Sequence, residues 1–158
     1  MRFLLYDRVT SLSKGRSITG VKTFGLADES LRGHFGRSPV VPATMLVEAM
    51  AQLLGWAVIH AHDFQLAAIL CLVDGATFSS PRIRPGFIAE LGGEILVNGS
   101  EDSLGRAWMD VEGMRVASID RVIFRHFRPV RPRLLQRTFA YCSGAEWDEP
   151  QGGGDSTS

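Results

Sequence analysis

The sequence of 158 residues has little cysteine, little lysine and no net charge. Two cysteines, Cys71 and Cys142, are too few for the disulfide framework of a small secreted domain, so we expect a reduced, cytoplasmic protein. The 17 basic and 17 acidic residues cancel, which gives no overall bias toward nucleic acid or a membrane surface. These shortages exclude disulfide scaffolds and predict no nucleic-acid or membrane partner.

The sequence also lacks an uninterrupted apolar run of the roughly 18 residues that a membrane span requires. The nearest candidate, residues 43–61, is apolar at most positions but contains Thr44, Glu48 and Gln52. These polar residues are four apart, so on a helix they form one narrow stripe. We therefore expect a buried helix with Thr44 as its N-terminal cap, Glu48 where water is scarce and Gln52 supporting Glu48.

Two histidines follow at the end of this helix, His60 and His62. They are two residues apart and point to different helix faces, which disfavours a shared metal. A positive charge at the helix C-terminus explains them better. We expect no metal site here.

The rest of the chain predicts strands. Apolar stretches at 3–12, 16–24, 67–78, 86–97, 106–111 and 115–127 are separated by turn residues. The stretch at 67–78 suits a mostly buried strand, with Cys71 as a small core residue. Strands on both sides of one long helix predict an α+β fold in which a curved antiparallel sheet wraps the helix. We expect one domain over 1–140, a disordered tail over 141–158 and a dimer that covers the exposed edge of the sheet.

The segment from 121 to 137 holds six arginines and no acidic residue. One interpretation is a solvated strand end followed by a tail. The alternative is a docking surface for an acidic partner. Both interpretations remain open from the sequence.

A loop rich in glycine and proline, residues 25–42, precedes the helix and carries His34. Loops of this length in compact domains are usually functional. A histidine that leads into a helix carrying an enclosed acid forms a plausible acid/base pair. His34 and Glu48 are therefore the candidate catalytic residues.

The same residues resemble a family signature. The hot-dog-fold 3-hydroxyacyl-acyl-carrier-protein dehydratases carry H-F-P-G-x-P-x-x-P-G, followed by E-A-x-A-Q in the FabZ type. Here His34-Phe35, Pro39, Pro42 and the run Glu48-Ala49-Met50-Ala51-Gln52 fall in register. The similarity extends over residues 3–127, so the sequence is identified as a member of this family with a hot-dog fold.

The resemblance implies dehydration of a 3-hydroxyacyl thioester, carried by an acyl carrier protein, to a trans-2-enoyl thioester in fatty-acid or polyketide-type biosynthesis. It implies His34 as base, Glu48 as acid and the backbone N–H of Ala43 as the donor to the thioester oxygen. It also implies a homodimer with His34 and Glu48 from opposite subunits and no cofactor. The acyl chain would lie in a tunnel between the subunits, lined by residues such as Met45, Leu53 and Trp56.

The sequence departs from the signature at two places. Gly36-Arg37 replaces the Pro-Gly that follows His-Phe in the signature, and Ser38 precedes Pro39. Ala43 replaces the glycine that follows the last proline of the signature. These departures leave two alternatives open. One is a hot-dog acyl thioesterase, and the other is an inactive partner subunit of a heteromeric dehydratase.

Overall fold

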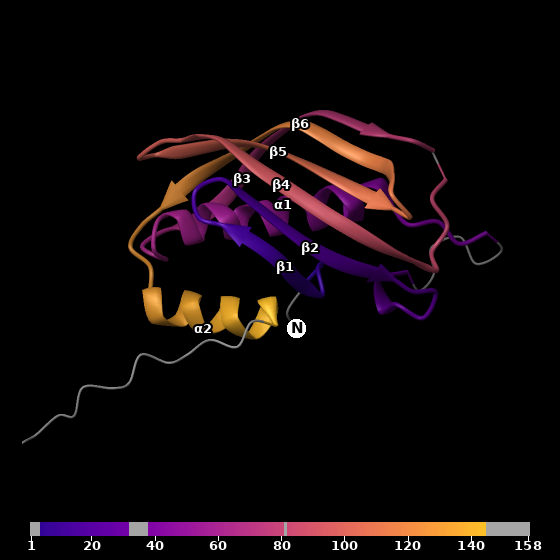
Figure 1. Ribbon diagram of the computed structural model, residues 1–158, viewed down its shortest axis with the longest axis horizontal. Helices are drawn as coiled ribbons and strands as arrows, with labels where there is room; N and C mark the ends of the chain where they lie inside the picture. Colours follow the sequence, from indigo (N-terminus) through magenta and orange to yellow (C-terminus); the bar gives the residue numbers. More distant parts are fainter. Residues whose placement is uncertain (1–3, 32–37, 81, 145–158) are drawn as a thin grey trace, which may run out of the picture.

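The computed structural model describes residues 4–31, 38–80 and 82–144 (Figure 1). Six strands form one antiparallel sheet in the order β1-β2-β4-β5-β6-β3. The helices and strands are a short 3-10 helix at Glu29–Leu31, α1 (Ala43–Ala61), α2 (Pro132–Ser143), β1 (Arg8–Ser13), β2 (Ser17–Phe24), β3 (Ala67–Phe78), β4 (Phe87–Asn98), β5 (Asp102–Val111) and β6 (Met114–Phe127). The predicted α+β class is confirmed.

Helix α1 has the predicted bounds. Pro42 is the residue before the helix, with φ −58° and ψ 135°, and its missing N–H therefore costs no helical hydrogen bond. At the other end, Asp63 and Phe64 adopt positive φ and turn the chain into β3. By length and mean hydropathy α1 could cross a membrane, but 61% of its most apolar window is buried inside the fold. Helix α1 is a core helix.

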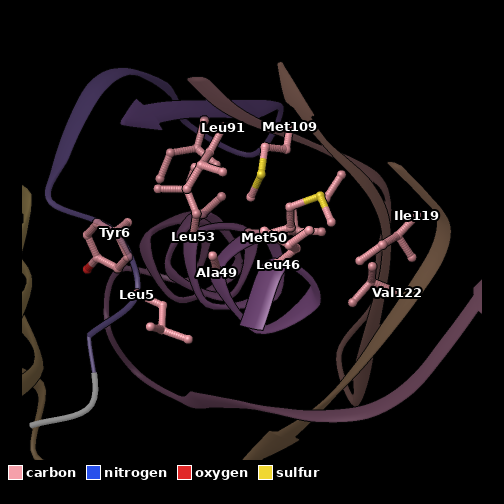
Figure 2. Close-up of a cluster of buried hydrophobic side chains, with 14 of the residues drawn as sticks. Leu5, Tyr6, Leu46, Ala49, Met50, Leu53, Leu91, Met109, Ile119 and Val122 are labelled. Atoms are coloured by element: carbon pink, nitrogen blue, oxygen red, sulfur yellow. The ribbon is translucent and has the colours of Figure 1, made fainter. Parts of the chain in front are cut away.

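The sheet covers one side of α1. Figure 2 shows Leu53 directed toward Leu91 and Met109 of the sheet, and all three side chains are at most 2% exposed. Gly105 lets the helix approach closely, because a Cβ at this position would lie 2.8 Å from a methyl carbon of Leu54. Burial of these side chains drives the association of helix and sheet.

The N-terminal segment departs from the predicted strand at 3–12. Strand β1 begins only at Arg8, while Leu5 and Tyr6 are buried beside α1 (Figure 2). The reason lies in the backbone, since the N–H of Leu5 donates to the side chain of Gln52 instead of to a neighbouring strand.

Strand β3 is also different from the prediction. It was expected to be mostly buried, yet Ile69 is 50% exposed, Leu72 is 41% exposed, and Cys71 lies on the surface. The prediction was wrong because β3 is an edge strand, and β6 is its one partner among the described strands. An apolar run is typical of a covered strand, but the sequence does not say whether its own chain provides the cover.

A second helix, α2, was not predicted. It lies on the side of α1 away from the sheet, as Figure 1 shows, so the sheet alone does not enclose α1. The side chain of Phe139 anchors it, with its ring centroid 5.4 Å from that of Trp56. The expected tail at 141–158 therefore starts too early, because α2 continues to Ser143 and Cys142 is buried.

Candidate active site

The polar stripe of α1 is built as a short hydrogen-bond relay. The amide nitrogen of Gln52 donates to Glu48 Oε1 over 2.8 Å. The amide oxygen of Gln52 accepts from the backbone N–H of Leu5 over 3.0 Å. Since the Leu5 bond fixes which end of the amide faces Glu48, Gln52 presents a donor to the carboxylate. Gln52 thus orients Glu48 and at the same time fastens the N-terminal segment.

This stripe lines a cavity of about 450 Å³. Glu48 and Gln52 line it near the N-terminal half of α1, and Ile59 lines it 11 residues further along, about 16 Å at the helical rise. Its other lining residues are Leu4, Ala51, Gly55, Trp56, Ala68, Leu70, Phe124, Thr138 and Cys142. Glu48 is the one acidic or basic side chain among the described residues that line this cavity. One acid in an elongated, largely apolar cavity suits a ligand with a polar head and an apolar chain.

Glu48 is less enclosed than its apolar helix predicts. It is half-buried, because the cavity leaves one side of the side chain open. The position where water was expected to be scarce is therefore enclosed only in part. An open side is where a substrate could reach the acid.

The predicted tunnel residues divide between two faces of α1. Trp56 lines the cavity, whereas Leu53 is fully buried on the opposite side, against the sheet. Met45 is half-buried against the core and does not line the cavity. Each residue advances by about 100° around a helix, so Leu53 cannot share the face of Glu48. Leu53 and Met45 therefore do not line this cavity, and their place in a tunnel between two subunits stays a prediction.

The sequence contained a signal for two of the missed cavity residues. Gly55 and Ile59 follow Glu48 by seven and eleven residues, which places them on the same helix face. Gly55 keeps the cavity open, since a Cβ there would lie 3.4 Å from the ring of Phe124. Phe124 and the α2 residues come from distant parts of the chain, and no local pattern links them to Glu48.

The start of α1 presents Ala43 and Thr44, both exposed. Among the described residues, the N–H of Ala43 has no hydrogen-bond acceptor, as expected for the first residue of a helix. Thr44 is not the cap that was predicted, because Pro42 occupies the N-cap position and no side chain caps the helix. The free N–H groups of the first turn, with the helix dipole, favour an oxygen that gains negative charge.

His34 lies outside the described residues. The loop that carries it rejoins the described chain ahead of α1, where the Val41 N–H donates to the Ile83 carbonyl over 2.8 Å.

His60, at the end of α1, differs from the prediction of a positive charge there. His60 packs against the rings of Phe64 and Phe139, and burial lowers its pKa below the usual value. A lowered pKa disfavours the positive charge that was expected at this helix end. His62 instead lies 2.9 Å from Asn98 through its Nε2 atom. Neither side chain lines the cavity.

Comparison with known proteins shows similarity in sequence, described first, and similarity in structure. Residues 1–86 match the model of the FabA-like domain. The chain is 36% identical over 124 residues to the 3-hydroxyacyl-[acyl-carrier-protein] dehydratase FabZ of Thiobacillus denitrificans, covering 75% of this chain and 83% of that protein. Both matches span the cavity-lining stripe of α1.

Two solved structures resemble the whole fold. A Streptococcus mutans protein bound to acetyl-CoA aligns with a TM-score of 0.64 at 13% identity, covering 83% of this chain and 95% of that chain. The dehydratase heterocomplex ApeI:P of Xenorhabdus doucetiae aligns with a TM-score of 0.62 at 16% identity, covering 85% and 89%. At these identities the likeness shows the fold alone, and it is the hot-dog fold that was predicted.

Proposed function

This chain belongs to the FabA-like family, and from this premise we propose that it dehydrates a 3-hydroxyacyl thioester on an acyl carrier protein to the trans-2-enoyl thioester. The observation that supports the proposal best is the Glu48 carboxylate, held by Gln52 on the wall of an elongated apolar cavity. The cavity offers room for the acyl chain along α1, with the acid near one end.

The chemistry requires one base, one acid and one oxygen-stabilising donor. In our proposal His34 removes the proton from the α-carbon, and the N–H of Ala43 donates to the thioester oxygen as that oxygen gains charge. Glu48 protonates the departing β-hydroxyl. One C–H and one C–O bond break, a C=C bond forms, and water leaves. Acid/base groups suffice for these steps, so we propose that no cofactor takes part.

We further propose that two copies form the catalytic unit, with His34 and Glu48 from opposite subunits. The surface of β3 supports this idea. Ile69, Leu70 and Leu72 are 36–50% exposed on a strand whose outer edge is unpaired within the described chain. A second copy that pairs along this edge would bury these side chains and satisfy the free backbone groups. We place the enzyme in the cytoplasm, in fatty-acid or polyketide-type biosynthesis.

The test is turnover of a purified 3-hydroxyacyl-carrier thioester, followed by the formation of the conjugated enoyl product. His34→Ala and Glu48→Gln should each lower kcat by about 10²–10⁴-fold, the range for loss of a general acid or base. Circular dichroism and the melting temperature control for folding. Near wild-type turnover in either variant contradicts the assignment.

The same assay separates the alternatives. Release of free carrier thiol without an enoyl product identifies a thioesterase. Turnover that requires a second, different chain identifies an inactive partner subunit. Mixing the His34→Ala and Glu48→Gln proteins should restore part of the activity if each site draws on two subunits. No recovery after confirmed subunit exchange contradicts the shared site.

A further inference from the structure

The arginines between 121 and 143 fall into two groups in the structure. Three of them are engaged locally: Arg121 with Asp74, Arg125 with Glu101, and Arg128 with the carbonyl of Ser100. The other three are Arg131, Arg133 and Arg137, which are exposed and form no ion pair with any described residue. Because α2 contains no acidic residue, this second group forms a concentrated positive region on a protein of zero net charge.

Helix α2 combines this charge with exposed apolar groups. Arg133 and Arg137 are four residues apart and so lie on one helix face. On or beside this face, Leu134 is 54% exposed and Tyr141 is 77% exposed. We call Arg133, Leu134, Arg137 and Tyr141 the outer face of α2. A face that mixes arginine with exposed leucine and tyrosine has the composition of a protein-binding surface rather than of a purely solvated one.

A groove continues the outer face at the start of α2. It has a volume of about 510 Å³ and is lined by Pro129, Val130, Arg131, Leu134 and Leu135. Its wall is mostly apolar, and Arg131 is the one charged residue among the described residues that line it. The groove and the outer face share Leu134, so they form one continuous surface.

This surface adjoins the active-site cavity. Thr138 and Cys142 of α2 line the cavity that holds Glu48, while Phe139 fixes the helix to Trp56 on α1. Thr138 follows Leu134 by four residues, which makes them neighbours on α2. One side of α2 therefore walls the cavity, and the adjoining side carries the arginines and the groove.

We propose that the outer face of α2, together with the groove at its start, docks the carrier protein through an acidic surface that also carries apolar side chains. The inference rests on the proposed function, which supplies a carrier-linked substrate. Charge complementarity selects an acidic partner, and Leu134 and Tyr141 select a protein surface rather than a bare phosphate. Docking here would place the carrier beside the wall of the cavity that holds Glu48, without contact between the arginines and the reacting atoms.

The experiment compares three substrates that share one acyl group: the carrier-linked, CoA-linked and pantetheine-linked 3-hydroxyacyl thioesters. The test variant is Arg133→Gln/Arg137→Gln. The matched control is Arg121→Gln/Arg125→Gln, which removes two arginines already paired elsewhere. Binding of the carrier protein to each form is measured separately by calorimetry, so it does not depend on turnover.

For the test variant we expect kcat/KM on the carrier-linked substrate to fall about tenfold or more, with kcat/KM on the pantetheine-linked substrate within about twofold of wild type. The control should stay within about twofold on both. Salt should lower the carrier-linked kcat/KM of wild type more steeply than that of the test variant. Carrier affinity should fall in parallel with the kinetic loss.

Four results would overturn the inference. An equal loss of kcat/KM on all three substrates would mean that α2 acts through the shape of the cavity. An equal loss of kcat/KM in the control variant would mean that the number of positive charges matters and their position does not. If kcat/KM falls as much on the CoA-linked substrate as on the carrier-linked one, the arginines bind the nucleotide of CoA instead of a carrier protein. Unchanged carrier affinity in the test variant would exclude the outer face. If wild type binds the carrier and the test variant does not, but neither turns over, docking stands and the proposed dehydration fails.

Discussion

The relay through Gln52 can be tested by changing one atom of its side chain. In Gln52→Glu, one oxygen still accepts from the Leu5 N–H, but the group that faces Glu48 becomes a carboxylate oxygen in place of the donor now 2.8 Å away. Two carboxylates this close cannot both ionise freely, so the pair retains a proton to a higher pH. The variant should therefore lose stability as the pH rises.

The size of this loss in stability follows from the distance between the two carboxylates. Two unit charges about 3 Å apart repel by about 1.4 kcal/mol in bulk water and by about 5.5 kcal/mol at an effective dielectric constant of 20. Glu48 is half-buried, so the loss in the free energy of unfolding should fall between these limits. The native pair holds its proton more tightly than the unfolded chain, in which a glutamate has a pKa of about 4.3. The loss should begin near pH 4.3 and level off above the raised pKa of the pair.

Gln52→Leu is the matched comparison. It removes both hydrogen bonds and leaves the N–H of Leu5, a residue 5% exposed, without an acceptor. The substitution should lower the free energy of unfolding by about 1–3 kcal/mol, with little dependence on pH. Urea unfolding of both variants and wild type between pH 4 and pH 8 provides the measurement. If Gln52→Glu follows wild type across this range, the Glu48–Gln52 contact does not exist in solution and the positioning role of Gln52 is refuted.

Three further predictions concern the cavity and the helix start. Phe139→Ala should lower the free energy of unfolding by about 3–5 kcal/mol, or detach α2 alone, because the ring is 4% exposed and packs on Trp56. Hydrogen exchange of the α2 amides distinguishes global unfolding from local detachment. Full protection of these amides in the variant contradicts the anchoring role of Phe139. Gly55→Val should reduce kcat/KM for long acyl chains more than for short ones, since a Cβ already reaches 3.4 Å from Phe124; an unchanged chain-length profile over a substrate series argues against acyl binding here. Ala43→Pro should remove the free N–H and cost about 2.7–4 kcal/mol of transition-state stabilisation; normal turnover in a variant with wild-type circular dichroism shows that this N–H is not catalytic.

The local pattern of the sequence determined much of the fold. Pro42 and the apolar run after it predicted α1 with the bounds that the structure has. Glu112 and Gly113, both at positive φ, form the turn between β5 and β6, where the sequence places turn residues between the apolar stretches at 106–111 and 115–127. The four-residue spacing of Glu48 and Gln52 predicted their shared stripe, because helical geometry alone decides which side chains lie on one face. Their catalytic roles remain predictions, as does that of His34.

Only the tertiary structure decided which parts of the protein each face of a helix or strand contacts. Leu53 and Trp56 are both apolar residues of α1, and composition gives no reason to place one against the sheet and the other in the cavity. Helix α2 carried signals in Pro132 and Gly144, but one interpretation of its arginines was a solvated strand end and tail. The packing of Phe139 on Trp56 joins residues far apart in the chain, so no local pattern shows it. The exposure of β3 likewise depends on its position at the sheet edge. Periodicity is a property of neighbouring residues, whereas burial depends on contacts between residues far apart in the chain, and these form only when the whole chain folds.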